Sequence, residues 1–126
     1  MPRGLIATAV LVPLLLGAQA AHGQKSTEQF IPLGQSPGLS ATATDIAALS
    51  AVDADNRTIT LPTAGGRIVK VTERTRIWLD RSKLGQPNVS GAFEDLRVGR
   101  QVEVLYEDET RRQTAEWIKV VPQGGE

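Results

Sequence analysis

The sequence predicts a small all-β domain that is made behind a cleavable export signal. Two features predict this organisation. Residues 5–16 form an apolar run without a charged side chain, preceded by the basic Arg3, which is the layout of a signal peptide. From residue 45 onward, short runs of alternating apolar and polar residues are separated by turn-forming residues, which is typical of antiparallel strands joined by hairpins.

The expected signal peptide covers residues 1–23. Its apolar run is shorter than the roughly 20 residues that cross a bilayer, and Pro13 would kink a permanent membrane helix. Small residues suited to signal peptidase occur at 18–20 and again at 21–23, and both cleavage sites stay open. We therefore expect a periplasmic or secreted protein with no membrane anchor after cleavage.

Composition limits what the mature chain can be. About 100 residues remain after cleavage, enough for one core and too few for two domains. The chain has no cysteine, which excludes disulfides, thiolate zinc sites and a catalytic thiol. Its 14 basic residues are balanced by 14 acidic ones, so nothing attracts it generally to phosphate backbones. We expect no nucleic-acid partner.

Residues 24–44 are rich in proline, glycine and small polar residues and show neither a strand nor a helix period. They are expected to form an extended, partly disordered lead-in. One apolar stretch, from Phe30 to Leu33, interrupts them. It is expected either to pack on its own domain or to contact a partner.

The domain itself is expected over residues 45–122, with a flexible tail at 123–126. Strands are expected at 46–52, 58–61, 67–72, 75–80, 102–106 and 114–121. The first of them also suits a helix, because it contains several alanines. A helical turn over 91–96, capped by Ser90, is expected to plug one end of the β structure with Phe93 and Leu96.

Five or six short strands with one helical turn before the last pair predict a partly open antiparallel barrel. The arrangement expected is an OB-like barrel, of the oligonucleotide/oligosaccharide-binding type. Closure removes exposed strand edges, which a domain of this size cannot otherwise cover well. A two-layer sandwich remains the alternative.

The order of strands and turns also resembles a known family. The resemblance covers roughly residues 45–121 and rests on segments 51–53, 56–61, 75–77, 95–99, 102–104 and 115–120. The chain is similar there to a widespread domain of unknown function, found in small exported bacterial β-barrel (OB-like) proteins. The resemblance implies a bacterial, envelope-side β-barrel, and it implies no catalytic residue.

The sequence offers no catalytic or metal-binding set. The only histidine, His22, lies at the expected cleavage site and outside the expected domain, so we expect no Ser/His pair. Acidic residues gather at Asp53 and Asp55 and at 107–109, where they are expected to form turns and add surface charge. The only methionine is Met1, which leaves no ligands for a soft metal. We expect no cofactor and no metal.

The remaining candidate for a functional site is a contact surface. On strict alternation Trp78 shares a face with Arg76 and Asp80, and Trp117 shares one with Ala115 and Lys119. If the two strands lie side by side, the tryptophans form an interaction patch. The candidate contact residues are Trp78, Trp117, Arg76, Arg81, Lys119, Phe30 and Leu33. The alternative is that each tryptophan covers a seam or end of the barrel, and a β-bulge would reverse the facing.

These observations predict an exported, non-enzymatic binding or interaction module whose partner is an envelope protein, a peptide or a glycan. Two alternatives stay open. The chain could be a structural or accessory subunit of an envelope complex, or a divalent-metal-dependent hydrolase that uses acidic residues.

Overall fold

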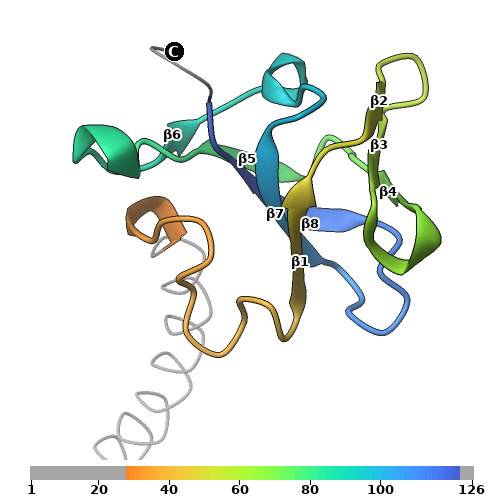
Figure 1. The fold of residues 1–126 in the computed structure, drawn as a ribbon, viewed down its shortest axis with the longest axis horizontal. Coiled ribbons are helices and arrows are strands. Elements are labelled where there is room, and N and C mark those ends of the chain that lie inside the picture. The colour runs from red at the N-terminus through yellow and green to blue at the C-terminus, as the bar shows by residue number, and fades with distance from the viewer. Residues whose placement is uncertain (1–27, 123–126) are drawn as a thin grey trace, which may run out of the picture.

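The computed structural model describes residues 28–122, which form two β-sheets and several short 3₁₀ turns (Figure 1). The larger sheet has the strand order β1-β7-β8-β5-β6, and the smaller one has the order β2-β3-β4. The strands are β1 (Thr44–Ala48), β2 (Ala51–Asp53), β3 (Thr58–Leu61), β4 (Arg67–Lys70), β5 (Arg76–Leu79), β6 (Val89–Ser90), β7 (Gln101–Tyr106) and β8 (Ala115–Val120). The 3₁₀ turns are η1 (Glu28–Phe30), η2 (Thr63–Gly65), η3 (Ser82–Leu84) and η4 (Phe93–Asp95). The mainly β class is confirmed.

One hydrophobic core lies between the two sheets. The smaller sheet contributes the fully buried Ile59, Leu61 and Val69, and the larger sheet contributes residues such as Val102 and Ile118. The β-branched alternation of these strands places every second side chain in this core. η4 closes the core as the sequence predicts, because Phe93 and Leu96 both pack into it.

The strands do not close into a barrel, which differs from the OB-like arrangement expected. Strand pairing is interrupted at residues 49–50, between β1 and β2, and at residues 71–75, between β4 and β5. At the second break, the Thr75 hydroxyl accepts from the Thr72 N–H and donates to the carbonyl of Ala115. Side-chain hydrogen bonds of this kind compete with ladder pairing, and the chain leaves one sheet for the other there.

One pairing of the larger sheet, between β8 and β5, is parallel, whereas the sequence predicts antiparallel strands throughout. β5 runs parallel to β8, with Arg76 opposite Trp117 and Trp78 opposite Lys119. The chain leaves β5, forms η3, β6, η4 and β7, and only then returns as β8. A long connection of this kind allows two strands to lie parallel.

A bulge changes which residues of β8 face the core. Leu105 pairs with Trp117, and Tyr106 pairs with Ala115, so Glu116 is the extra residue of a β-bulge. Ala115 consequently lies in the core, while Trp117 and Lys119 face the other side of the sheet. The expected shared face of Ala115 and Trp117 is wrong for this reason.

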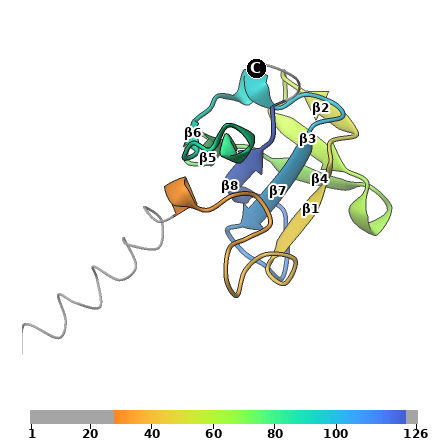
Figure 2. The same ribbon diagram turned by 60° about the vertical axis from the view of Figure 1, so that its left-hand side comes forward.

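Residues 28–43 fold back over that outer side of the larger sheet, and we call them the N-terminal strap (Figure 2). They follow a series of turns, with the N–H of Gln35 donating to Pro32 and that of Ala43 to Leu39. Thr44 already opens β1. Residues 28–43 therefore form turns that contact the larger sheet, and residues 24–27 of the expected lead-in lie outside the described residues. The expected signal peptide and the tail at 123–126 lie outside the described residues.

The cap of η4 also differs from the sequence expectation. Ser90 belongs to β6 and does not cap the turn. The carboxylate of Asp95 accepts a hydrogen bond from the Ala92 N–H at 2.8 Å instead. A side-chain acceptor at the start of the turn serves the same purpose, because it satisfies a donor that has no partner within the turn.

Candidate functional site

Trp78 and Trp117 are brought together by the parallel pairing of β5 and β8, as the interaction-patch hypothesis requires. Both lie on the outer side of the larger sheet. With Arg74, Arg76 and Glu116 they line a hollow of about 70 Å³, which we call the tryptophan hollow. Its sides are the two indoles, and its rim carries charged groups of both signs.

A cation covers a face of each indole. The Arg76 guanidinium lies 4.6 Å from the Trp78 ring centroid, and Lys119 Nζ lies 4.7 Å from that of Trp117. Such cation–π contacts are favourable electrostatically. Arg76 is exposed to solvent, whereas Lys119 is fully buried. Arg76 is thus the group of the two that can meet a partner.

The tryptophans are less exposed than an open aromatic patch would be. Trp78 is 6% exposed and Trp117 is 4% exposed. Most of each ring therefore packs on the sheet and its surroundings, which agrees with the covering role that the sequence left as the alternative. Only the part of each ring that faces the tryptophan hollow is available for contact.

A second, more open depression of about 450 Å³ adjoins the first and shares Arg74 with it. Arg57 also lines it, together with residues 71–73. Arg57 has a positive φ of 52°, a conformation that few residues other than glycine adopt. Its guanidinium lies 4.7 Å from the Phe93 ring centroid, so this side chain is held against an aromatic face as Arg76 is.

The fully buried Lys119 is fastened to the N-terminal strap. Its Nζ donates to Glu28 Oε1 at 2.6 Å and lies 3.0 Å from Ser36 Oγ, and the Ser36 hydroxyl donates to the same carboxylate oxygen at 2.8 Å. A buried charge needs a partner of opposite sign, and Glu28 supplies it. Lys119 is therefore unavailable to a partner molecule, which corrects its place among the predicted contact residues.

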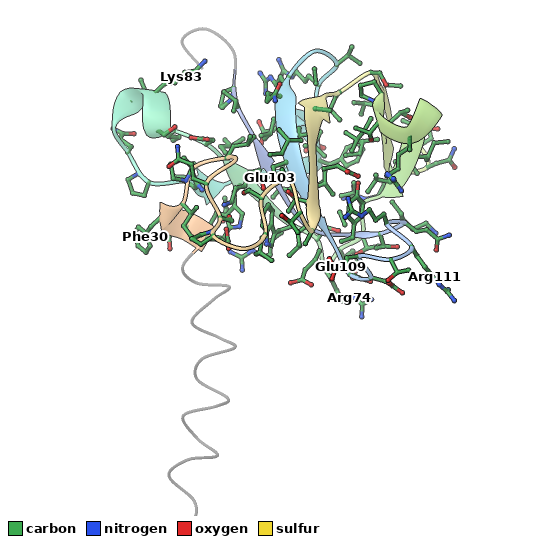
Figure 3. All side chains as sticks on the ribbon, turned by 60° about the horizontal axis from the view of Figure 1, so that its bottom comes forward. Phe30, Arg74, Lys83, Glu103, Glu109 and Arg111 are labelled. Carbon is green, nitrogen blue, oxygen red and sulfur yellow. The ribbon has the colours of Figure 1, made fainter. Side chains whose placement is uncertain are left out.

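Glu103 lies directly opposite Lys119 on β7 and is also fully buried. Its carboxylate accepts from the Gly34 N–H at 2.7 Å, the Ser40 hydroxyl at 2.6 Å and the Thr44 hydroxyl at 2.9 Å. Figure 3 shows Glu103 inside the molecule, with Phe30 and Lys83 at its periphery. All of its partners come from the strap or from the start of β1. Glu103 therefore fastens the strap and faces no open space in which a substrate could lie.

Asp80 is the third charged anchor of the strap, after Lys119 and Glu103. Its carboxylate accepts from the Leu33 N–H and the Ser82 N–H, each at 2.8 Å. Burial raises the pKa of Asp80. The hydrogen bonds from Ser82 and Leu33 and the charge of Lys119 lower it by more, so the pKa lies below its ordinary value. The group stays ionised at neutral pH, as an anchor and not as an acid catalyst.

Asp45, the second residue of β1, joins the two sheets. Its carboxylate accepts from the Tyr106 hydroxyl at 2.7 Å and from Arg112 at 2.9 Å, and Arg67 Nε of β4 lies 3.1 Å away. Burial first, and then the hydrogen bond and charge of Asp45, raise the pKa of Tyr106 well above its ordinary range. This phenol therefore keeps its proton at neutral pH and stabilises the contact between the sheets.

The remaining predicted contact residues lie apart from the tryptophan hollow. Phe30 is 66% exposed on η1, whereas Leu33 is half-buried where the strap docks. Arg81 is half-buried beside η3, beyond the other end of β5. None of the three lines the hollow. They are therefore not one surface with the tryptophans.

Two lining residues were missed at the sequence level. Glu116 reaches the tryptophan hollow because it is the bulged residue of β8, and Arg74 reaches it from the break before β5. Both positions depend on irregular backbone that a period of two does not reveal. The only signal for them in the sequence was that each lies close along the chain to one of the two tryptophans.

The acidic turns hold no arrangement that points to a metal. No group of three histidine, cysteine or acidic side chains that could hold an ion occurs within residues 28–122. At the turn before β3, hydrogen bonds from Asn56, first from its side chain and then from its backbone, lower the pKa of Asp53. Asp53 thus serves the turn. No helix in this part of the chain is long and apolar enough to cross a membrane.

Comparison with known proteins identifies no relative of this chain. No family model, no curated protein and no solved structure matches the chain.

Proposed function

We propose that this chain is an exported, non-enzymatic interaction module and that the tryptophan hollow is its contact site. The observation that carries the proposal is the placement of two tryptophans and an exposed arginine around one indentation on adjacent strands. Tryptophan and arginine are enriched among the residues that dominate protein–protein binding energy. The partner in this proposal is another protein of the envelope, held through one of its side chains or an extended segment.

The size of the hollow favours a protein contact over a small-molecule substrate. Pockets that enclose small molecules measure roughly 300–1,000 Å³, several times the volume of about 70 Å³ found here. A space of this size suits the tip of one apolar side chain. A permanent accessory subunit and a transient binding partner would use the same contact, whereas the metal-dependent hydrolase is left without a supporting set of ligands in residues 28–122.

We further propose that the two sheets are a divided form of the OB-like barrel, in keeping with the resemblance to exported β-barrels. The support is the order of pairing. If β1 with β2 is one bent strand and β4 with β5 another, the pairs β1–β7, β7–β8, β8–β5, β4–β3 and β3–β2 form a ring. A ring of five such segments is the pattern of a partly open barrel.

Site-directed photocrosslinking in the cells that export the protein tests the contact site. A photoreactive residue at position 116, in the hollow, is expected to yield a discrete adduct with one partner, and Arg76→Ala is expected to weaken that adduct. The matched control places the same residue at Lys83, an exposed position on η3 on the other side of the molecule from Arg74 (Figure 3).

The same adduct from positions 116 and 83, or none from position 116, would remove the hollow from consideration. Exposed variants are preferred to changes of the tryptophans, because both indoles are buried and their loss would destabilise the sheet. Detection of a processed N-terminus in the exported fraction tests the export step independently.

A further inference from the structure

We infer that the partner presents an acidic polypeptide segment with apolar side chains, and that Arg57, Arg74 and Arg76 receive its carboxylates. The inference rests on the proposed function and names the chemistry of the partner. It starts from the two adjoining hollows, which share Arg74 and carry one further arginine each.

Two of these arginines are held in place before any partner arrives. Arg57 lies over Phe93, and Arg76 lies over Trp78, with guanidinium-to-ring distances of 4.7 and 4.6 Å. A guanidinium that contacts an aromatic face keeps donors free to pair with carboxylate oxygens, often two at once. Less side-chain entropy is lost on binding when the side chain is already fixed.

Two of the three arginines have no carboxylate partner within the described residues, and the third has only a long, exposed ion pair. Neither Arg57 nor Arg76 forms a salt bridge to any carboxylate within residues 28–122. Arg74 is 81% exposed, and its one acidic neighbour, Glu107, lies at 3.7 Å, too far for a strong hydrogen bond. An acidic ligand therefore has three cations to meet, and it displaces no strong internal pair.

The acidic residues of the same surface decide between classes of anion. Glu73 lines the open depression, and Glu116 lines the tryptophan hollow. A uniformly charged polymer such as a nucleic acid or a sulfated polysaccharide would place negative charge beside both glutamates. A polypeptide can place carboxylates at the arginines and neutral or apolar groups elsewhere. The apolar walls of the tryptophan hollow also require an apolar group, which a polypeptide supplies.

Nuclear magnetic resonance titration of the mature protein tests this inference. The probe is a blocked eight-residue peptide of alternating leucine and glutamate, and its matched control replaces every glutamate by glutamine. The indole N–H signals of Trp78 and Trp117 report on the hollow, because the chain contains only these two tryptophans. We expect the acidic peptide to shift them at a concentration about tenfold lower than its neutral counterpart, since hydrogen bonds to charged groups are the stronger ones.

Substitutions assign the effect to the arginines. Arg57→Gln and Arg76→Gln are each expected to weaken binding of the acidic peptide several-fold and to weaken binding of the neutral peptide by clearly less. Lys83→Gln removes the same charge far from the hollows. It is expected to change binding of the acidic peptide only by the small amount that the loss of one net positive charge causes. Unchanged signal dispersion in each variant shows that the fold is intact.

Each other outcome has a defined meaning. Equal shifts by both peptides would overturn the acidic partner while leaving the tryptophan hollow as a contact site. Shifts that heparin produces as strongly as the acidic peptide would overturn the polypeptide in favour of a polyanion. No indole shift with either peptide would overturn this inference, whereas the crosslinking experiment judges the proposed function separately.

Discussion

At the scale of single residues, the most constrained group is the ammonium of Lys119, which sits in the interior between a sheet and the N-terminal strap. It is fully buried, pairs with Glu28 and contacts the ring of Trp117. A buried pair of this kind is weak evidence for net stabilisation, because desolvation of both charges offsets their attraction. Loss of one partner destabilises the folded state strongly, because an unpaired charge then remains buried.

We therefore predict that Glu28→Ala lowers the free energy of unfolding by about 3–5 kcal/mol. The double variant Glu28→Ala/Lys119→Met should recover much of that loss, because it removes the orphaned charge as well. Urea unfolding followed by tryptophan fluorescence measures both values.

The control is Glu109→Ala, which removes an exposed carboxylate at the tip between β7 and β8. A surface change of this kind should alter stability by no more than about 0.5 kcal/mol. If Glu28→Ala were as mild as this control, the buried pair would not stabilise the native state as we describe.

At the scale of elements, the N-terminal strap behaves as a separate unit that polar contacts fasten to the sheet. The fully buried Glu103 and the nearly buried Asp80 hold its middle. Asn88 holds its beginning, because its side-chain amide donates to the carbonyls of Glu28 and Ile31 at 3.0 and 2.8 Å. Loss of one fastening should therefore loosen the strap before it loosens the strands.

Asn88→Ala tests this order. We predict faster hydrogen–deuterium exchange across the strap, with β7 and β8 remaining protected, because segments open in cooperative units. The measurement is exchange mass spectrometry on peptides that separate residues 28–43 from 101–120. Ser90→Ala serves as the matched control, since Ser90 is exposed on β6, directly after the segment that holds Asn88. Equal acceleration in the strap and in β7 would show that the two open as one unit.

At the scale of the whole molecule, the two sheets are joined by the core and by the cluster around Asp45. Tyr106 of β7 donates its hydroxyl hydrogen bond to this carboxylate, which also faces Arg67 of the smaller sheet. Because the folded state raises the pKa of Tyr106, the folded protein retains a proton that the unfolded chain loses near about pH 10. The contribution of this group to stability is therefore present below that pH and declines above it.

The chain has one tyrosine, so tyrosinate absorbance reports this group alone. We predict that no tyrosinate signal develops near pH 10 in the folded protein and that the signal rises only with alkaline unfolding. Tyr106→Phe should cost about 0.5–1.5 kcal/mol at neutral pH and lose this part of the alkaline dependence. An ordinary titration near pH 10 in the folded state would contradict the buried hydrogen bond to Asp45.

Local sequence predicted most of the strands, because their signal is local, but it did not predict β6 or the break between β1 and β2. The strands expected at 58–61 and 102–106 are present as β3 and β7, and Phe93 and Leu96 close the core as expected. The candidate site was predictable in part: alternation put both tryptophans outside the aliphatic core. Alternation did not indicate that the N-terminal strap covers Lys119 and Glu103, because their hydrogen-bond partners lie 59 to 91 positions away along the chain.

The sequence by itself determined where most strands of this chain lie and that Phe93 and Leu96 close the core, because those properties depend on spacing over a few residues. Only the tertiary structure decided that β5 lies parallel to β8, that a bulge brings Glu116 beside the tryptophans, and that the strap buries three charged anchors. These features depend on contacts between distant segments, and no period in the chain encodes them. The tryptophan hollow exists only where those contacts meet.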